Sequence, residues 1–343
     1  MSKAGVMLAF SFFDNYVAAK TTAKSFGTVA YNQDVVLGLE TEQPRNSSNV
    51  TDVVNEAGTV WGPSRVLLWD ESDTKRLLAS WQATGLPFPF FGKYSYGGAV
   101  NRLVALAKRE RCEYLVRVDP GTEPIGDFGG AVDRHIHSLG VNLKVVSGQY
   151  TQRLAIRDEF VPESIRSSYL DLIHECTGID PRPGRQVTGG AAFTVNVAAG
   201  PPAIPFDHLD PNQVKLMVWG SDDGFFQTLL GPLGAAVDFK TFIKRADPGV
   251  KLSIPGYAER LSNAVALREA QKGFGDIPAI LGSIDRFRDR LKELLGQHPS
   301  SIQSANQISA MPPVSPLTAE SVLNGYRNYV DLVDQWPSVS ASL

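Results

Sequence analysis

Two kinds of hydrophobic pattern alternate along the first 120 residues. Short apolar runs, typical of strands buried in a parallel sheet, occupy residues 6–12, 35–39, 65–69 and 114–118. Segments with the apolar spacing of amphipathic helices lie between them, at 14–28, 49–57, 73–84 and from 97 onward. This regular order of strand and helix predicts an α/β fold on a mostly parallel sheet flanked by helices.

The second half of the chain continues the pattern and then becomes helical. Helices are expected at 127–139 and 162–176, and strands at 143–147, 187–197 and 215–219. Helical spacing returns at 257–272, 277–295 and 318–333, and residues 299–318, rich in Ser, Pro and Gln, are expected to form a flexible linker. We therefore expect a sheet domain over residues 1–250 and a helical C-terminal extension over 251–343.

Composition and charge restrict the possible classes of protein. The chain has 343 residues, 43% hydrophobic and 20% charged, with a formal net charge of -3 at pH 7. Such a charge gives no reason to expect nucleic acid as a partner. The two cysteines cannot form a disulfide framework. The apolar run at 6–13 is too short for a membrane span and no cleavage site follows it, so a cytoplasmic protein without a membrane span is expected.

One stretch carries the most specific signal. Gly97-Gly98-Ala99-Val100-Asn101-Arg102 opens a helical pattern, and the strand after that helix stops at Asp119-Pro120-Gly121-Thr122. A helix that opens on small residues, followed by a buried strand with a carboxylate at its end, is how open α/β sheets present ligands. This motif pair resembles the nucleotide-sugar-binding half of GT-A glycosyltransferases, in the style of family 2. The resemblance implies a GT-A (Rossmann-like) fold with a donor half near 1–125 and an acceptor half near 126–250.

The resemblance also implies residues for the nucleotide. Asn101 and Arg102 are expected at the start of a helix, with Arg102 approaching the nucleotide or its diphosphate. Ser11 ends the first strand where the family often has Thr. Glu40 ends the second strand where the family often places an Asp that recognises uracil. A UDP-sugar is therefore the favoured donor.

A divalent cation is expected beside Asp119. In the family, Mg²⁺ or Mn²⁺ held by strand-end carboxylates offsets the charge that builds on the leaving diphosphate. Most such enzymes carry Asp-x-Asp, whereas this chain has Gly121 in the second position. Asp119 with the diphosphate can still hold Mg²⁺, which keeps most of its waters, and Glu123 is a substitute ligand.

The catalytic base is expected in an acidic pair about a hundred residues later. Asp222 and Asp223 lie in Trp219-Gly220-Ser221-Asp222-Asp223-Gly224. Adjacent carboxylates at a helix start repel one another, which raises one pKa toward the range of a useful base. By the family's pattern, Asp223 is the base, Asp222 its neighbour, and the transfer to an acceptor hydroxyl inverts the anomeric centre.

Other functions stay open at this level. The alternatives are an inactive sugar-nucleotide-binding or scaffold protein, a nucleotidyltransferase on a related sheet, and a sugar-processing hydrolase. A nucleotidyltransferase would want a glycine-rich, basic loop directly after the first strand, which Ser11-Phe12-Phe13-Asp14 lacks. A hydrolase would need two carboxylates facing one cleft. The acceptor is expected to be a small molecule or a glycan, with the helical extension forming an acceptor wall or a homodimer contact.

Overall fold

The computed structural model describes residues 5–84, 96–139, 145–150, 161–178, 192–199, 235–245, 254–273 and 276–341. The strands are β1 (Gly5–Ser11), β2 (Asp34–Glu40), β3 (Val66–Trp69), β4 (Tyr114–Val118), β5 (Thr122–Pro124), β6 (Val145–Tyr150), β7 (Ala192–Asn196) and β8 (Ala235–Arg245). The helices are α1 (Tyr16–Gly27), α2 (Ser48–Trp61), α3 (Glu71–Thr84), α4 (Tyr96–Arg109), α5 (Phe128–Leu139), α6 (Glu163–Thr177), α8 (Ile254–Gln271), α9 (Ile277–Gly296), α10 (Ile302–Ser309) and α11 (Pro316–Ala341). Short 3₁₀ turns are η1 (Pro63–Arg65), η4 (Val197–Ala199) and η6 (Pro299–Ser301).

The described strands form one mixed sheet in the order β3-β2-β1-β4-β7-β6-β8-β5. β1 pairs in parallel with β2 and β4, β2 with β3, and β6 with β8. β7 runs antiparallel between β4 and β6, and β5 runs antiparallel to β8. The expected α/β class, a mostly parallel sheet flanked by helices with further helices after it, is confirmed.

The strand order reverses beside β1. From β1 the chain adds β2 and then β3 on one side, and it returns to place β4 on the other side. These four strands are parallel, so their carboxyl ends meet at one edge of the sheet. In open α/β sheets, ligands bind outside the carboxyl ends of the strands at such a switch point. The topology therefore places a candidate ligand site near the ends of β1, β2 and β4.

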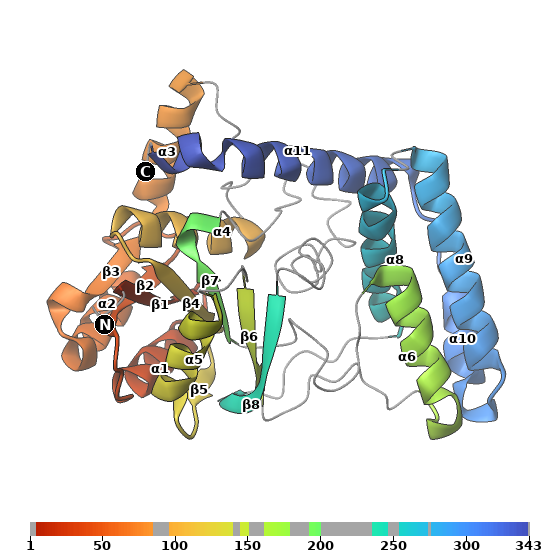
Figure 1. Cartoon of the computed structure of the whole chain (residues 1–343), viewed down its shortest axis with the longest axis horizontal. Helices are drawn as coiled ribbons and strands as arrows, with labels where there is room; N and C mark the ends of the chain where they lie inside the picture. The colour runs from red at the N-terminus through yellow and green to blue at the C-terminus, as the bar shows by residue number, and fades with distance from the viewer. Residues whose placement is uncertain are drawn as a thin grey trace.

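Alternation along β1 divides the core into two layers. Val6, Leu8 and Phe10 pack with α1, α2 and α5 on one face of the sheet. Met7 and Ala9 point to the opposite face, where α4 covers the sheet. Figure 1 shows α4 on one side of the first strands and α1 and α5 on the other. Because the buried side chains of α4 join those of α6 and the C-terminal helices in one cluster, the sheet and the helical extension share a core.

The C-terminal helices form a layered group that α6 joins. α6 packs on α8 and α9, α10 packs on α9, and α11 crosses α8 and α9 before it extends across the top of the view in Figure 1. The prediction of a flexible linker at 299–318 is wrong for residues 299–309. η6 and α10 occupy these residues, because Ala305 and Ile308 share a buried helical face. The boundary at residues 250 and 251 stays a prediction.

One strand of this region is not expected from the sequence, and one expected strand cannot be compared. β8 lies at 235–245, where the hydrophobic pattern predicts no strand, whereas the strand expected at 215–219 lies outside the described residues. Within the described ranges, none of the helices combines the length and the apolar character that a membrane span requires.

Gly129 in α5 offers a test of the packing between α5 and the loop before β2. A Cβ at Gly129 would lie 2.1 Å from the backbone oxygen of Ala30, whereas a Cβ at Gly58 in α2 would meet nothing closer than 3.7 Å. We expect Gly129→Ala to lower the free energy of unfolding by about 1–3 kcal/mol, because backbone must move. The control Gly58→Ala should raise it by about 0.5–1 kcal/mol, since alanine favours helix. Urea denaturation measures both, and equal effects would contradict the close contact.

Candidate functional site at the carboxyl edge of the sheet

Three of the residues expected at the nucleotide site meet in one cluster. Ser11 and Glu40 are register partners at the last positions of β1 and β2. The Arg102 side chain reaches them from α4 and donates from Nε to Glu40 Oε1 at 2.8 Å. Its Nη2 donates to Glu42 Oε1 at 3.0 Å. Arg102 and Glu40 are both fully buried, and Glu42 is only 11% exposed, so these ion pairs are shielded from water.

The position of Arg102 on its helix differs from the expectation. α4 begins at Tyr96, so that Asn101 and Arg102 lie in its second turn and not at its start. Both side chains are fully buried. The expected attraction of an anion to an unpaired helix start therefore does not apply to these two residues. Arg102 is directed to two carboxylates of this chain, and a direct contact with a diphosphate stays a prediction.

Glu40 carries the most unusual electrostatics of the cluster. Burial raises the pKa of its carboxyl above the ordinary value, although Arg102 and Ser11 act to lower it. Within the part of the chain that the structure describes, Glu40 Oε2 is buried and has no hydrogen-bond partner. A buried carboxylate oxygen left without a donor costs free energy, so such an atom calls for an explanation.

Asp119 follows β4 at the same edge of the sheet. Its Oδ1 lies 2.5 Å from Nη2 of Arg117, whose side chain is only 4% exposed, while the Asp119 side chain is 19% exposed. The turn after it needs Gly121, which has a φ of 82°. Thr22 of α1 accepts from Gly121 N at 2.9 Å and donates to Thr122 O at 3.2 Å. The Asp119 loop is thereby anchored to α1.

Asp119 is the described residue beside which a metal is expected. No group of three or more His, Cys, Asp or Glu side chains that could hold a cation occurs among the described residues. Glu123 lies in β5, opposite Lys244 of β8 in the register. Mg²⁺ sites often use one or two carboxylates together with substrate phosphates. A single carboxylate, already paired with Arg117, agrees with a weak site that a bound diphosphate would complete.

Sequence reasoning missed Glu42, Arg117 and Thr22. Each had a visible signal: Glu42 lies two residues after Glu40, and Arg117 interrupts the apolar run of β4. Thr22 is a buried polar side chain in an amphipathic helix. Asp222 and Asp223, the expected catalytic pair, lie outside the described residues.

Among the comparisons of this chain with known proteins, only the comparison with solved structures finds similar proteins. No family model matches this chain, and no curated protein matches it. A mannosyltransferase from Pyrobaculum calidifontis, solved with GDP-Man and Mn²⁺, is 10% identical with a TM-score of 0.48, and the alignment covers 100% of this chain and 85% of that one.

Two further solved structures are similar to a comparable degree. Glucosyl-3-phosphoglycerate synthase from Mycobacterium tuberculosis, in complex with phosphoglyceric acid, is 11% identical over 79% of this chain and 80% of that one, with a TM-score of 0.46. Mouse xyloside xylosyltransferase 1 is 13% identical over 74% of this chain and 100% of that one, with a TM-score of 0.43. The three solved structures are glycosyltransferases, and all three TM-scores lie below 0.5.

Proposed function

We propose that the protein is a glycosyltransferase that moves a sugar from a nucleoside-diphosphate sugar, with a UDP-sugar favoured, to an acceptor hydroxyl. The observation that carries the proposal is the buried Glu40 Oε2, which has no hydrogen-bond partner in the described chain and lies at the end of β2. It lies beside the switch point where α/β sheets bind ligands.

Glu40 suits recognition of a nucleotide base. An ionised carboxylate accepts hydrogen bonds only, and uracil presents an imide N–H that a carboxylate oxygen can accept. Arg102 holds Oε1 at 2.8 Å and fixes the orientation of the carboxyl group, so that Oε2 is the oxygen left for the ligand. Ser11 supports the same group from the end of β1. In this proposal Arg102 orients Glu40, and Ser11 and Asn101 lie around the base.

Asp119 is proposed to face the diphosphate. Mg²⁺ or Mn²⁺ bound there would offset the negative charge that develops on the leaving group. Arg117 holds the Asp119 carboxyl group in place through Oδ1, and Thr22 holds the loop that follows it. The proposed base, Asp223 with Asp222 beside it, would take the proton of the acceptor hydroxyl and give an inverting transfer.

A second candidate is a sugar-nucleotide-binding protein that performs no transfer. The ion pair between Arg117 and Asp119 favours it, because Arg117 partly neutralises the carboxylate that would hold the metal. Gly121, in place of a second carboxylate, also favours a protein that performs no transfer, because it removes a metal ligand. Detection of a glycosylated product under turnover conditions separates the two functions.

Nucleotide binding tests the proposal directly. Among UDP, GDP, CDP and ADP, we expect UDP to give the largest rise in melting temperature, and Mn²⁺ to increase that rise, since ligands that bind the native state stabilise it. Asp119→Ala should abolish the increase due to Mn²⁺ and keep most of the metal-free effect of UDP. Differential scanning fluorimetry and titration calorimetry measure both.

A surface carboxylate provides the matched control. Asp289 is 73% exposed and pairs with Lys292 one turn along α9, so Asp289→Ala should leave nucleotide binding unchanged. Full retention of the Mn²⁺ effect in Asp119→Ala would remove Asp119 from the metal site. Failure of all four nucleotides to bind would refute the donor assignment.

A further inference from the structure

The carboxylate expected beside a metal is already covered by a cation of the chain itself. Arg117 is in β4 and Asp119 directly follows that strand, so the two side chains, two residues apart, stand on the same face of the sheet. Arg117 Nη2 lies 2.5 Å from Asp119 Oδ1. The Arg117 side chain is only 4% exposed, whereas that of Asp119 is 19% exposed. The guanidinium is therefore nearly closed off from water, and the carboxylate is its route to the surface.

The register places this pair on the same face as the candidate nucleotide site. Arg117 stands beside Ala9 of β1, and Ala9 belongs to the core on the α4 face. Two residues further on, the same alternation brings Ser11 and Asp119 to this face, and Ser11 is the register partner of Glu40. Neighbouring strands are about 4.8 Å apart, so Asp119 lies about 10 Å from Glu40 along the row of strand ends. One elongated ligand can reach both.

The backbone that carries Asp119 is held from the other side. Thr22 of α1 accepts from Gly121 N at 2.9 Å and donates to Thr122 O at 3.2 Å. Thr122 Oγ1 in turn donates to Asp119 O at 2.5 Å. Because this loop is anchored, the carboxylate cannot move far from Arg117. A divalent cation that binds Asp119 must therefore share the carboxylate with the guanidinium or displace it.

Displacement is unfavourable unless Arg117 gains another anion. Taking a carboxylate away from a buried guanidinium is strongly destabilising, and a metal ion beside the guanidinium adds repulsion between like charges. A diphosphate removes both costs. Its oxygens match the planar fork of a guanidinium, and its negative charges balance a divalent cation. Asp119, Arg117, the cation and the diphosphate of a sugar nucleotide together are neutral, whereas the pair with the cation alone is not.

We propose that Arg117 changes partner when the donor binds: it gives up Asp119 to a divalent cation and contacts the diphosphate of the sugar nucleotide. In the empty protein Arg117 holds Asp119, and in the loaded protein it holds the donor. The cation and the nucleotide then bind together, and each raises the affinity for the other by the same factor. This inference rests on the proposed function and adds a diphosphate-binding residue to it.

Mn²⁺ binding to the full chain without nucleotide tests the competition for Asp119. We expect Arg117→Met to bind Mn²⁺ about tenfold more tightly than the wild type, since residues bonded to a metal ligand change metal affinity by about tenfold or more. Arg117→Lys keeps the positive charge and should bind Mn²⁺ about as weakly as the wild type. Electron paramagnetic resonance of the free ion measures all three proteins.

UDP should reverse this order. We expect Arg117→Met to bind the complex of Mn²⁺ and UDP about tenfold more weakly than the wild type, because a hydrogen bond to a charged group is lost. Lysine lacks the planar fork, so Arg117→Lys should also bind this complex more weakly than the wild type. That comparison keeps the contact with the diphosphate testable if Arg117→Met does not fold. Titration calorimetry measures the affinities, and a merely structural role for Arg117 gives no reversal.

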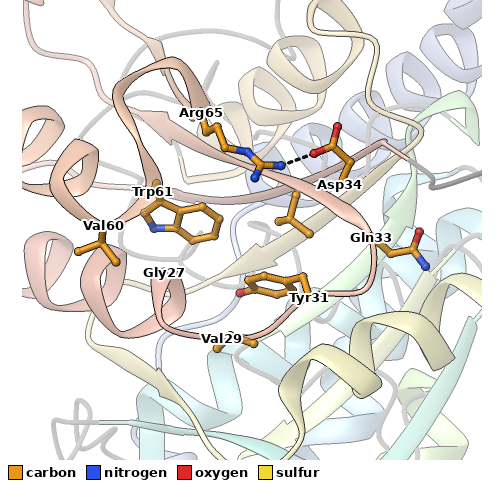
Figure 2. A pocket seen from close by; sticks show the side chains of 9 residues that line it. Gly27, Val29, Tyr31, Gln33, Asp34, Val60, Trp61 and Arg65 are labelled. Carbon is orange, nitrogen blue, oxygen red and sulfur yellow. Dashed lines mark hydrogen bonds and ion pairs between the residues drawn. The ribbon is translucent and has the colours of Figure 1, made fainter.

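A second pair of Asp and Arg controls for the release of a carboxylate. Asp34 and Arg65 contact each other beside a pocket at the opposite end of β2, as Figure 2 shows, and their side chains are 65% and 47% exposed. Arg65→Met frees a carboxylate that water already screens, so it should leave the binding of Mn²⁺ and of UDP unchanged.

Each half of the proposal has an outcome that would overturn it. Equal Mn²⁺ affinity of the wild type and Arg117→Met would overturn the competition for Asp119. Equal affinity of the wild type and both Arg117 variants for the complex of Mn²⁺ and UDP would overturn the contact with the diphosphate, and the donor assignment would stand. Tighter Mn²⁺ binding by Arg117→Met in a protein that binds no nucleotide would refute the donor assignment and the diphosphate contact, while the competition for Asp119 would stand.

Discussion

Arg102→Met is expected to lower the free energy of unfolding by about 3–5 kcal/mol at pH 8. The substitution removes a fully buried cation that pairs with Glu40 at 2.8 Å and with Glu42 at 3.0 Å. Methionine fills a similar volume, so that the loss reports the unpaired carboxylates and not a cavity. Denaturation in urea measures it. The exposed Arg290, which is 49% accessible, provides the control, and Arg290→Met should cost about 1 kcal/mol or less.

The pH dependence of this loss has a definite sign. Burial raises the pKa of Glu40 and Arg102 lowers it, so removing Arg102 raises it further. Glu40 then takes up a proton more readily in the folded variant than in the unfolded chain, which stabilises the folded variant as the pH falls. The difference between variant and wild type should therefore be smaller at pH 5 than at pH 8. Adding Glu40→Gln to Arg102→Met should recover part of the loss at pH 8.

A difference below about 1 kcal/mol at pH 8, or one that grows toward pH 5, would contradict a buried ion pair at this place. The same measurement bears on the site. If Arg102 orients Glu40, the double variant that regains stability should still bind UDP more weakly than the wild type. Recovery of stability together with full UDP affinity would mean that the cluster stabilises the fold without contacting the nucleotide.

Asp223→Asn is expected to lower turnover by about 10²-fold or more, which is the usual contribution of a positioned general base. Asparagine keeps the size and much of the hydrogen bonding of the side chain but removes its basicity. Nucleotide binding should stay nearly unchanged, because the proposed donor site lies at the ends of β1, β2 and β4, which do not include Asp223. Initial rates, measured with a sugar donor that carries the nucleotide bound best in the panel, report turnover, and calorimetry reports nucleotide binding.

The stereochemistry of the product gives an independent test of the base. An inverting transfer needs a base on the face of the sugar opposite the departing diphosphate, and Asp223 is proposed for that role. NMR coupling constants of the product report its anomeric configuration. A product with the configuration of the donor would rule out this mechanism while leaving a transferase intact. Asp222→Asn should change turnover less than Asp223→Asn if Asp223 is the base.

Local hydrophobic pattern determined the first half of the fold. β4 runs from Tyr114 to Val118, the bounds of the run expected from the sequence, because a strand buried on both faces is mostly apolar; Arg117 is its one charged residue. The ends of β1 and β2, and hence the placing of Ser11 and Glu40 at one edge, follow from the same pattern. The parallel order of the first four strands was expected from strand and helix alternation.

Contacts between segments far apart in the sequence decided the parts of the fold that the hydrophobic pattern did not predict. Residues 299–309 are polar enough to suggest a linker, yet they form η6 and α10, because α9 buries the face that carries Ala305 and Ile308. β8 depends on pairing with β6, and a sequence pattern cannot state a partner that lies about ninety residues away.

The candidate site shows the same division. The sequence by itself determined which polar residues end the strands, since Ser11, Glu40 and Asp119 each follow a buried apolar run. Only the tertiary structure decided that Arg102 turns toward Glu40 and Glu42. The physical reason is that a buried guanidinium must pair with the carboxylates that the fold brings to it, and Glu40 and Glu42 reach Arg102 from the end of β2, about sixty residues away in the sequence.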